Sequence, residues 1–198
     1  MKKIIYTQRV EIVESYGERR DCADQKIPEF IKECGYLPIP ISNLSELVPL
    51  YFDIIKPDGV MLTGGNSLVS QGGNAPEKDA TDENIIRYAL KNKIPIYGFC
   101  RGMQSILDYF GYDLVPVSNH VAVVHNLYGE YEGMQVNSYH NQGIKEVKEP
   151  FQVLAYTEDG VIEAIQSTEY KIIGTMWHPE REQPFSQKDI ERVKKLYG

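Results

Sequence analysis

The chain has 198 residues, of which 42% are hydrophobic and 25% are charged, and its formal net charge is −7. This length suits one domain with a full hydrophobic core, which we expect to span residues 1–198. The acidic balance and the absence of a basic stripe argue against a nucleic-acid partner. No apolar run approaches the roughly 20 residues needed to cross a membrane, so no membrane partner is expected either.

Strand and helix patterns alternate through the first half of the chain. Four short apolar segments predict strands, at residues 3–7, 36–41, 58–63 and 94–99. Helical spacing of apolar residues predicts four helices, at residues 23–34, 44–55, 79–92 and 103–110. The polar, Gly-rich segment 64–78 predicts a loop. Such alternation is typical of a parallel sheet that helices cover on both faces.

After Gly111 the pattern changes to short strand-like segments separated by turn residues. These segments are residues 112–117, 121–127, 131–136, 151–157, 161–166 and 171–176. Many of them are expected to extend the sheet in antiparallel orientation, and a helix at residues 187–196 closes the chain. The predicted fold class is therefore α/β, a doubly wound and mostly parallel sheet with antiparallel extensions.

Residues 98–102 read Gly-Phe-Cys-Arg-Gly and lie between a predicted strand and a predicted helix. Small residues on both sides let the chain reverse sharply and hold Cys100 in a strained conformation above the sheet. The N-terminus of the following helix would direct its positive end at the thiolate. This pattern predicts a nucleophile elbow with Cys100 as the nucleophile.

A nucleophilic thiol needs a base, and the base needs an orienting group. His178 follows the predicted strand 171–176 and is the best candidate for the base. Glu180 lies two residues further on, so in an extended segment it points the same way and can hold the imidazole. The backbone N–H groups of Arg101 and of Gly65 or Asn66 are the expected oxyanion donors.

Each of these residues also has an ordinary structural interpretation. Cys100 alone could be a small buried hydrophobe, His178 a hydrogen-bonded surface residue, and the glycines turn residues. Their combination in this order favours catalysis. The odd number of cysteines and their spacing favour a reducing, cytoplasmic compartment. The four histidines have no metal-binding spacing, so neither a metal nor another cofactor is expected.

Three motifs together resemble the class I glutamine amidotransferase superfamily: GFCRGMQ at residues 98–104, SYHNQ at 138–142 and WHPE at 177–180. The resemblance implies its flavodoxin-like architecture, a Cys-His-Glu triad and a γ-glutamyl thioester intermediate. The NSYHNQ string is most similar to the γ-glutamyl hydrolase branch, which includes γ-glutamyl-γ-aminobutyrate hydrolase. The same resemblance implies that the glutamyl group is held by Gln104, Ser138, Tyr139 and His140.

The leaving-group end departs from that branch. Asn66-Ser67 follows the Gly-Gly turn where an acidic residue is common, and Lys78-Asp79 replaces Arg-Asp. After the first strand come Arg9, Arg19 and Arg20, which form either a solvated charged loop or an anion clamp. This stretch and the short chain look like the γ-glutamyl-CDP-amidate hydrolases of capsular phosphoramidate synthesis. On that interpretation, Arg9 and Arg19 bind substrate.

The predicted activity is hydrolysis of a γ-glutamyl amide, with a nucleotide phosphoramidate or a small amine as leaving group. One alternative is a glutaminase subunit that supplies ammonia to a separate synthase. Others are a non-catalytic binding module on the same fold and a protein with a protease-like or redox role. The expected partner is the small-molecule substrate. The sequence is compatible with a homodimer but does not determine the oligomeric state.

Overall fold

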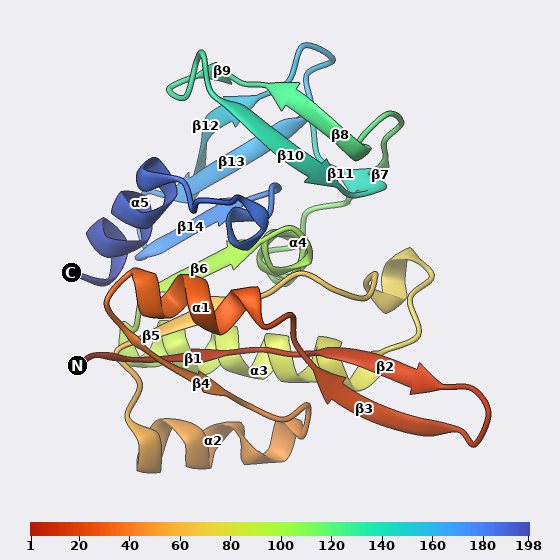
Figure 1. Ribbon diagram of the computed structural model, residues 1–198, viewed down its shortest axis with the longest axis vertical. Helices are drawn as coiled ribbons and strands as arrows, with labels where there is room; N and C mark the ends of the chain where they lie inside the picture. Colours follow the sequence, from red (N-terminus) through yellow and green to blue (C-terminus); the bar gives the residue numbers. More distant parts are fainter.

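The computed structural model describes residues 1–198 and is built around an eight-stranded sheet (Figure 1). Its strand order is β4-β1-β5-β6-β14-β13-β12-β9. The first five strands run parallel, and they are β4 (Leu37–Pro40), β1 (Lys3–Tyr6), β5 (Gly59–Leu62), β6 (Ile96–Phe99) and β14 (Ile172–Thr175). The remaining three add in antiparallel orientation, and they are β13 (Ile162–Ser167), β12 (Phe151–Tyr156) and β9 (Tyr128–Gly129).

Helices cover both faces of the parallel part, as expected from the uninterrupted apolar strands. On one face lie α1 (Lys26–Glu33) and α5 (Gln187–Tyr197), and on the other α2 (Val48–Leu50), α3 (Pro76–Asn92) and α4 (Arg101–Tyr109). A 3₁₀ turn (Ser45–Leu47) precedes α2 and a π-helical turn (Tyr51–Ile55) continues it, so the predicted helix 44–55 is confirmed in three pieces.

Side chains of the central strands alternate between two hydrophobic clusters. Ile4 and Met61 pack under α1 and α5, whereas the neighbouring Ile5, Val60 and Leu62 pack under α2, α3 and α4. All four residues of β5, β6 and β14 are buried. Because the central strands contribute side chains to both clusters, the sheet is packed on both faces. The residues that follow these strands therefore start from a firmly held position.

Three small antiparallel pairs surround this sheet. They are β2 (Arg9–Val13) with β3 (Glu18–Cys22), β7 (Val115–Pro116) with β11 (Gln142–Gly143), and β8 (Val121–Asn126) with β10 (Gln135–Tyr139). The β2–β3 hairpin projects from the body of the molecule (Figure 1). No helix is long and apolar enough to cross a membrane.

Several predicted boundaries were wrong. The strand expected at 131–136 is a turn followed by β10, because Gly133 adopts φ +82° and breaks the extended pattern. Only Val115–Pro116 of the expected strand 112–117 is extended. The expected loop 64–78 contains a 3₁₀ turn (Val69–Gln71) and the start of α3, where a proline occupies the first helical position.

Candidate active site

Cys100 lies in the sharp turn between β6 and α4. Its φ of +50° and ψ of −115° fall in a region that residues with a side chain rarely occupy. The turn is possible because its flanks are glycines. A Cβ atom on Gly98 would lie 2.7 Å from the carbonyl oxygen of Gly102, and one on Gly102 would lie 2.0 Å from that of Leu62. The predicted elbow is therefore present, with α4 starting directly after the cysteine.

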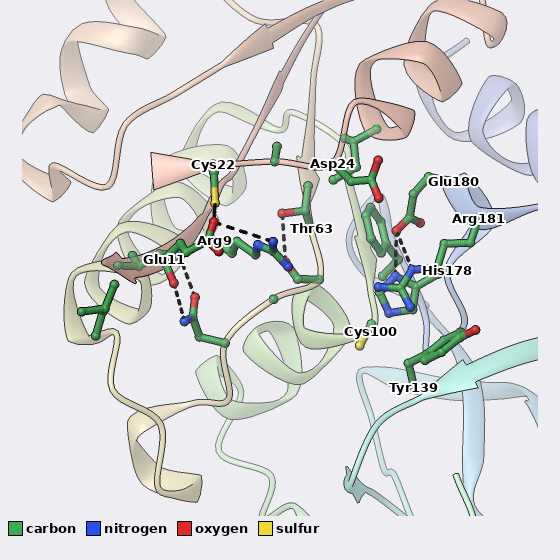
Figure 2. Close-up of a pocket in the computed structure, with 18 of the residues that line it drawn as sticks. Arg9, Glu11, Cys22, Asp24, Thr63, Cys100, Tyr139, His178, Glu180 and Arg181 are labelled. Carbon is green, nitrogen blue, oxygen red and sulfur yellow. Dashed lines mark hydrogen bonds and ion pairs between the residues drawn. The ribbon is translucent and has the colours of Figure 1, made fainter. Parts of the chain in front are cut away.

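His178 reaches the same place from the adjacent strand. Because β14 runs parallel to β6, both strands end at one edge, and the N–H of Cys100 donates to the carbonyl oxygen of Thr175 at 2.8 Å. The Nδ1 atom of His178 is 2.7 Å from Glu180 Oε1, and both side chains are almost fully buried. The structure thus brings together the three residues that the sequence predicted as a triad (Figure 2).

Asn137 fixes the backbone of the histidine and was not predicted. Its Oδ1 accepts from the N–H of His178 at 3.0 Å, and its Nδ2 donates to the carbonyl oxygen of His178 at 2.9 Å. The same Nδ2 group donates to Glu182 Oε1 at 2.7 Å. The asparagine begins the NSYHNQ string, but nothing in the sequence links it to a residue 41 positions later.

Two acidic neighbours determine the charge state of His178. Burial lowers its pKa, but hydrogen bonds and charge interactions with Cys100 and Glu180 outweigh burial and raise the pKa to about 9. The imidazole is therefore protonated at neutral pH. A cysteine reacts as its thiolate, and an imidazolium is a neighbour that favours this form in general. The rings of Phe99 and Tyr139 pack edge-on against the imidazole at centroid distances of 5.6 and 5.8 Å.

The Gly-Gly turn after β5 closes the third side of the site. A Cβ atom on Gly64 would lie 2.7 Å from His178 Cε1, and one on Gly65 would lie 2.6 Å from Arg9 Cβ. The backbone N–H groups of Gly65 and Asn66 donate to no other backbone group, and that of Arg101 lies in the first turn of α4. Their role as oxyanion donors stays a prediction.

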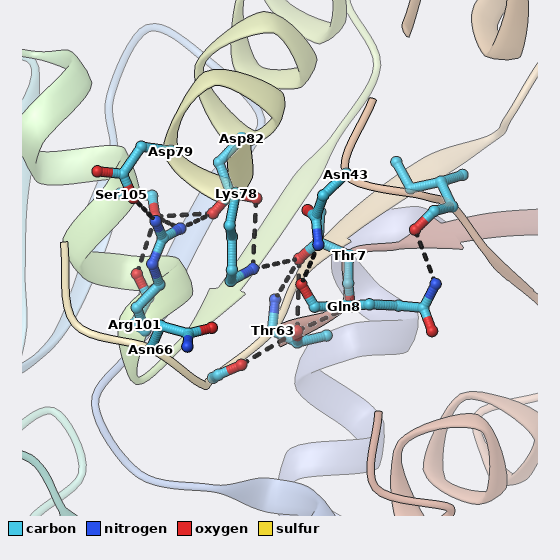
Figure 3. A network of polar contacts seen from close by, with 12 residues as sticks. Thr7, Gln8, Asn43, Thr63, Asn66, Lys78, Asp79, Asp82, Arg101 and Ser105 are labelled. Atoms are coloured by element: carbon cyan, nitrogen blue, oxygen red, sulfur yellow. Dashed lines mark hydrogen bonds and ion pairs between the residues drawn. The ribbon is translucent and has the colours of Figure 1, made fainter. Parts of the chain in front are cut away.

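The side chain of Arg101 lies in a buried polar network with residues of α3 and α4 (Figure 3). It donates to Asp79, to Asp82 and to Ser105. Lys78, which is fully buried, lies 3.5 Å from Asp82 and donates to Thr7 at 3.2 Å. Burial lowers the pKa of Lys78 well below its ordinary value and that of Arg101 to about 10. The network holds the backbone of the elbow from behind.

A cavity of about 730 Å³ opens in front of Cys100 and His178 (Figure 2). The β2–β3 hairpin forms its opposite wall, with Arg9, Glu11 and Cys22. The side chain of Asn66 holds that wall, because its Oδ1 accepts from the N–H of Val10 and its Nδ2 donates to the carbonyl oxygen of Val10, both at 2.8 Å. The volume lies within the range of small-molecule sites.

The residues predicted to bind substrate fall into two groups. Arg9 and Tyr139 line the cavity. The cavity is not lined by the other four side chains, which are those of Gln104, Ser138, His140 and Arg19. Gln104 donates to the carbonyl oxygen of Gln142 at 3.0 Å, and Ser138 donates to that of His120 at 2.7 Å. Arg19 pairs with Glu77 and donates to the carbonyl oxygen of Asn74 at 2.9 Å.

Four further charged residues line the cavity and were missed, namely Glu11, Glu14, Asp24 and Arg181. The guanidinium of Arg181 stacks over the ring of Tyr139 at 4.2 Å, and Asp24 lies two residues before α1. Arg181 directly follows the WHPE motif, and this position next to the motif is the only feature of the sequence that could have placed it in the cavity. The stretch with Arg9, Arg19 and Arg20, considered as a charged loop, is the β2–β3 hairpin.

Comparisons with known proteins agree with this geometry. The family model "Glutamine amidotransferase class-I" matches residues 33–192. The γ-glutamyl-CDP-amidate hydrolase of Campylobacter jejuni subsp. jejuni serotype O:2 is 34% identical over 181 residues, covering 89% of this chain and 88% of the relative. The γ-glutamyl-γ-aminobutyrate hydrolase PuuD of Escherichia coli K12 is 28% identical over 210 residues, covering 83% and 80%.

A solved structure from Thermoplasma acidophilum, assigned provisionally to a GMP synthase, has a similar fold. Its TM-score is 0.73 at 18% identity, and the match covers 100% of this chain and 94% of that one. At this identity the likeness concerns the fold alone. The family model covers most of the chain, and the first relative is 34% identical over 89% of it. The chain therefore belongs to the class I glutamine amidotransferase family, and the turn at Cys100 with the nearby His178 and Glu180 is consistent with this assignment.

Proposed function

We propose that the protein is a cysteine hydrolase that cleaves a γ-glutamyl amide and releases glutamate. The observation that carries the proposal is the Cys100 elbow beside a buried His178, which is hydrogen-bonded to Glu180 at 2.7 Å and faces the cavity. The names of two relatives, hydrolases of γ-glutamyl-CDP-amidate and γ-glutamyl-γ-aminobutyrate, support the same reaction class.

The proposed reaction has two stages. The thiolate of Cys100 attacks the γ-carbonyl carbon, and the backbone N–H groups of Arg101 and of Gly65 or Asn66 bind the oxyanion. His178 gives its proton to the leaving nitrogen, and the C–N bond breaks to leave a γ-glutamyl thioester. His178 then takes a proton from water, whose oxygen attacks the thioester carbonyl. The C–S bond breaks, glutamate is released, and the Cys100 thiolate and the protonated His178 are restored.

For the leaving group we favour a nucleotide phosphoramidate such as γ-glutamyl-CDP-amidate. The cavity of about 730 Å³ is larger than a glutamyl group needs, and two arginines, Arg9 and Arg181, line it. Arginine is the side chain best suited to bind phosphate oxygens in pairs. Asp24 and Glu11 also line the cavity and can accept hydrogen bonds from a base or a ribose.

The test is glutamate release by the wild type and by Cys100→Ala from γ-glutamyl-CDP-amidate, γ-glutamyl-γ-aminobutyrate and glutamine. We expect the nucleotide substrate to have the highest kcat/KM, and the variant to lose roughly 10³-fold or more with an unchanged circular dichroism spectrum. A mass increase of one glutamyl group on Cys100 would support the thioester. Activity of the variant within tenfold of the wild type would contradict the mechanism.

A further inference from the structure

Three histidines and one glutamate form a cluster away from the cavity, behind the strand that carries Tyr139. His125 lies in β8, His120 just before β8, His140 just after β10, and Glu163 in β13. The ring of His120 is 4.2 Å from that of His125 and 4.8 Å from that of His140, centroid to centroid. None of the four residues lines the catalytic cavity. The cluster therefore joins the β8–β10 pair to the central sheet independently of the proposed chemistry.

The carboxylate at the centre of the cluster has two histidine nitrogens close by but no well-aligned hydrogen bond. Glu163 is fully buried, and neither of its oxygens has an aligned donor. Its Oε1 atom lies 3.3 Å from His120 Nδ1 and 3.3 Å from His140 Nε2, and these two nitrogens are also without an aligned partner. A buried carboxylate needs a positive charge beside it, because isolated burial of the ion is strongly unfavourable.

The outer contacts of two histidines indicate which nitrogens face the carboxylate with lone pairs. His120 Nε2 is 3.2 Å from Asp159 Oδ2, and His140 Nδ1 is 3.0 Å from the carbonyl oxygen of Gln142. Both of those oxygens only accept hydrogen bonds, so each ring directs an N–H outwards. In a neutral ring the inner nitrogen then carries a lone pair, and the two lone pairs converge on the Glu163 carboxylate. Metal-binding histidines are oriented by outer acceptors in this way.

Two donor separations in the cluster fit a small divalent cation. A tetrahedral zinc ion with bonds of about 2.0–2.2 Å keeps its donor atoms roughly 3.4 Å apart, close to the two 3.3 Å separations. The ligand atoms of His120, His125 and Glu163 all lie within 4.8 Å of one another. His125 is half-buried and its Nε2 has no partner, so this nitrogen is available as a further ligand once the ring moves closer to the other donors.

We propose that His120, His125, His140 and Glu163 bind one Zn²⁺ ion in a tetrahedral structural site. Three imidazole nitrogens and one carboxylate oxygen are a donor set that zinc accepts. The half-buried His125 provides the route by which the ion enters from solvent. The ion neutralises Glu163 and ties β8, the end of β10 and β13 together, which would hold Tyr139 in the wall of the cavity.

The test uses the Cys100→Ser variant, so that the active-site thiol cannot bind the metal. After removal of metal with a chelator, Zn²⁺ is titrated against a chromophoric competitor and the melting temperature is followed. We expect one ion per chain with a Kd below about 1 μM and a rise in melting temperature. Substituted Co²⁺ should give the visible bands of tetrahedral nitrogen and oxygen ligation without a thiolate charge-transfer band.

Variants of the ligands decide whether binding occurs in the cluster. His125→Gln and Glu163→Gln, each in the Cys100→Ser background, should weaken Zn²⁺ binding at least tenfold. His178→Gln, which changes the one histidine outside the cluster, should leave the affinity unchanged. Because His125 is half-buried, its variant should fold even where Glu163→Gln does not.

Absence of stoichiometric binding to Cys100→Ser would overturn the proposal, and the positive charges on Glu163 would then be protons on the imidazoles. Equal Zn²⁺ affinity in Cys100→Ser and in its His125→Gln derivative would overturn it as well. No measurement here depends on turnover, so failure of the zinc site leaves the proposed hydrolase activity untouched, and failure of the activity leaves the zinc site untouched.

Discussion

The contacts of His178 leave a single atom free for chemistry. Its Nδ1 is hydrogen-bonded to Glu180, and its backbone N–H and carbonyl group are hydrogen-bonded to Asn137. Two aromatic rings pack against the imidazole. Only Nε2 remains for the proton transfers proposed above. Orientation by fixed neighbours of this kind is what a proton-transfer group needs, because a misplaced ring loses most of its effect.

The raised pKa of His178 predicts how activity depends on pH. The proposed mechanism uses the protonated ring as the acid, so kcat/KM should fall as the pH rises through about 9. Glu180→Gln removes one cause of the increase while burial, which lowers the pKa, remains. The alkaline limb of the profile should therefore move to lower pH. Steady-state rates across roughly pH 6 to 10 check this, and an unmoved limb would show that Glu180 does not act on His178.

Arg9 is the arginine best placed to bind an anionic leaving group. It lines the cavity and has only a long contact of 4.0 Å with Glu11, whereas Arg19 and Arg20 form close pairs with Glu77 and Glu18. Arg9→Ala should raise KM for γ-glutamyl-CDP-amidate roughly tenfold and leave hydrolysis of γ-glutamyl-γ-aminobutyrate almost unchanged. Arg20→Ala serves as the matched control from the same hairpin. If Arg9→Ala affects both substrates equally, an anion clamp at this position is wrong.

At the scale of elements, the β2–β3 hairpin shows where sequence patterns become ambiguous. Only Val10, Ile12 and Val13 of β2 are apolar, and four of the five residues of β3 are charged. This composition resembles a solvated loop, and strand propensity alone does not separate the two. Two hydrogen bonds of the Asn66 side chain join segments 56 residues apart in the chain and hold β2, while bonds from Asn43 to Asp21 and from Arg19 to Asn74 hold β3.

Loss of the Asn66 side chain should loosen the hairpin specifically. Asn66→Ala removes both hydrogen bonds to Val10, each contributing about 1 kcal/mol, and leaves the backbone N–H in place. Amide hydrogen exchange of residues 9–22 should accelerate at least several-fold, while exchange in β5 and β6 stays slow. The control is Ser67→Ala in the same loop, where the side chain is exposed. Unchanged exchange in the hairpin would contradict the role given to Asn66.

For the whole molecule, local sequence predicted the parallel core and the sharp turn at Cys100 well. Strands β5, β6 and β14 are apolar along their length because they are buried on both faces, and the elbow residues are contiguous in the chain. Groups that depend on distant pairing were missed. Asn137 acts on a residue 41 positions away, and the histidine cluster is assembled by β8, β10 and β13. Tertiary contacts of this kind leave no local period in the sequence.

The buried charges behind the elbow connect Thr7, after β1, with helices α3 and α4. The balance of positive and negative charges among them therefore affects the stability of the whole fold. Asp82, about 1% exposed, lies between Lys78 and Arg101. Asp82→Asn would leave those cations short of a counter-charge and should reduce the free energy of unfolding by about 3–5 kcal/mol in urea titrations. Asp79→Asn should cost less, because the Asp79 carboxylate is 27% exposed and water can replace part of the interaction. Equal costs would contradict this view of the network.

The two walls of the cavity come from separate parts of the fold, and this has a consequence for how substrate specificity can change. The residues proposed for bond cleavage come from the rigid ends of β5, β6 and β14, whereas Arg9, Glu11 and Cys22 come from a two-stranded ribbon outside the central sheet. A ribbon attached in this way behaves as an exchangeable part. Its length and charges can be rewritten in evolution, or by grafting in the laboratory, without disturbing the thiol and its histidine.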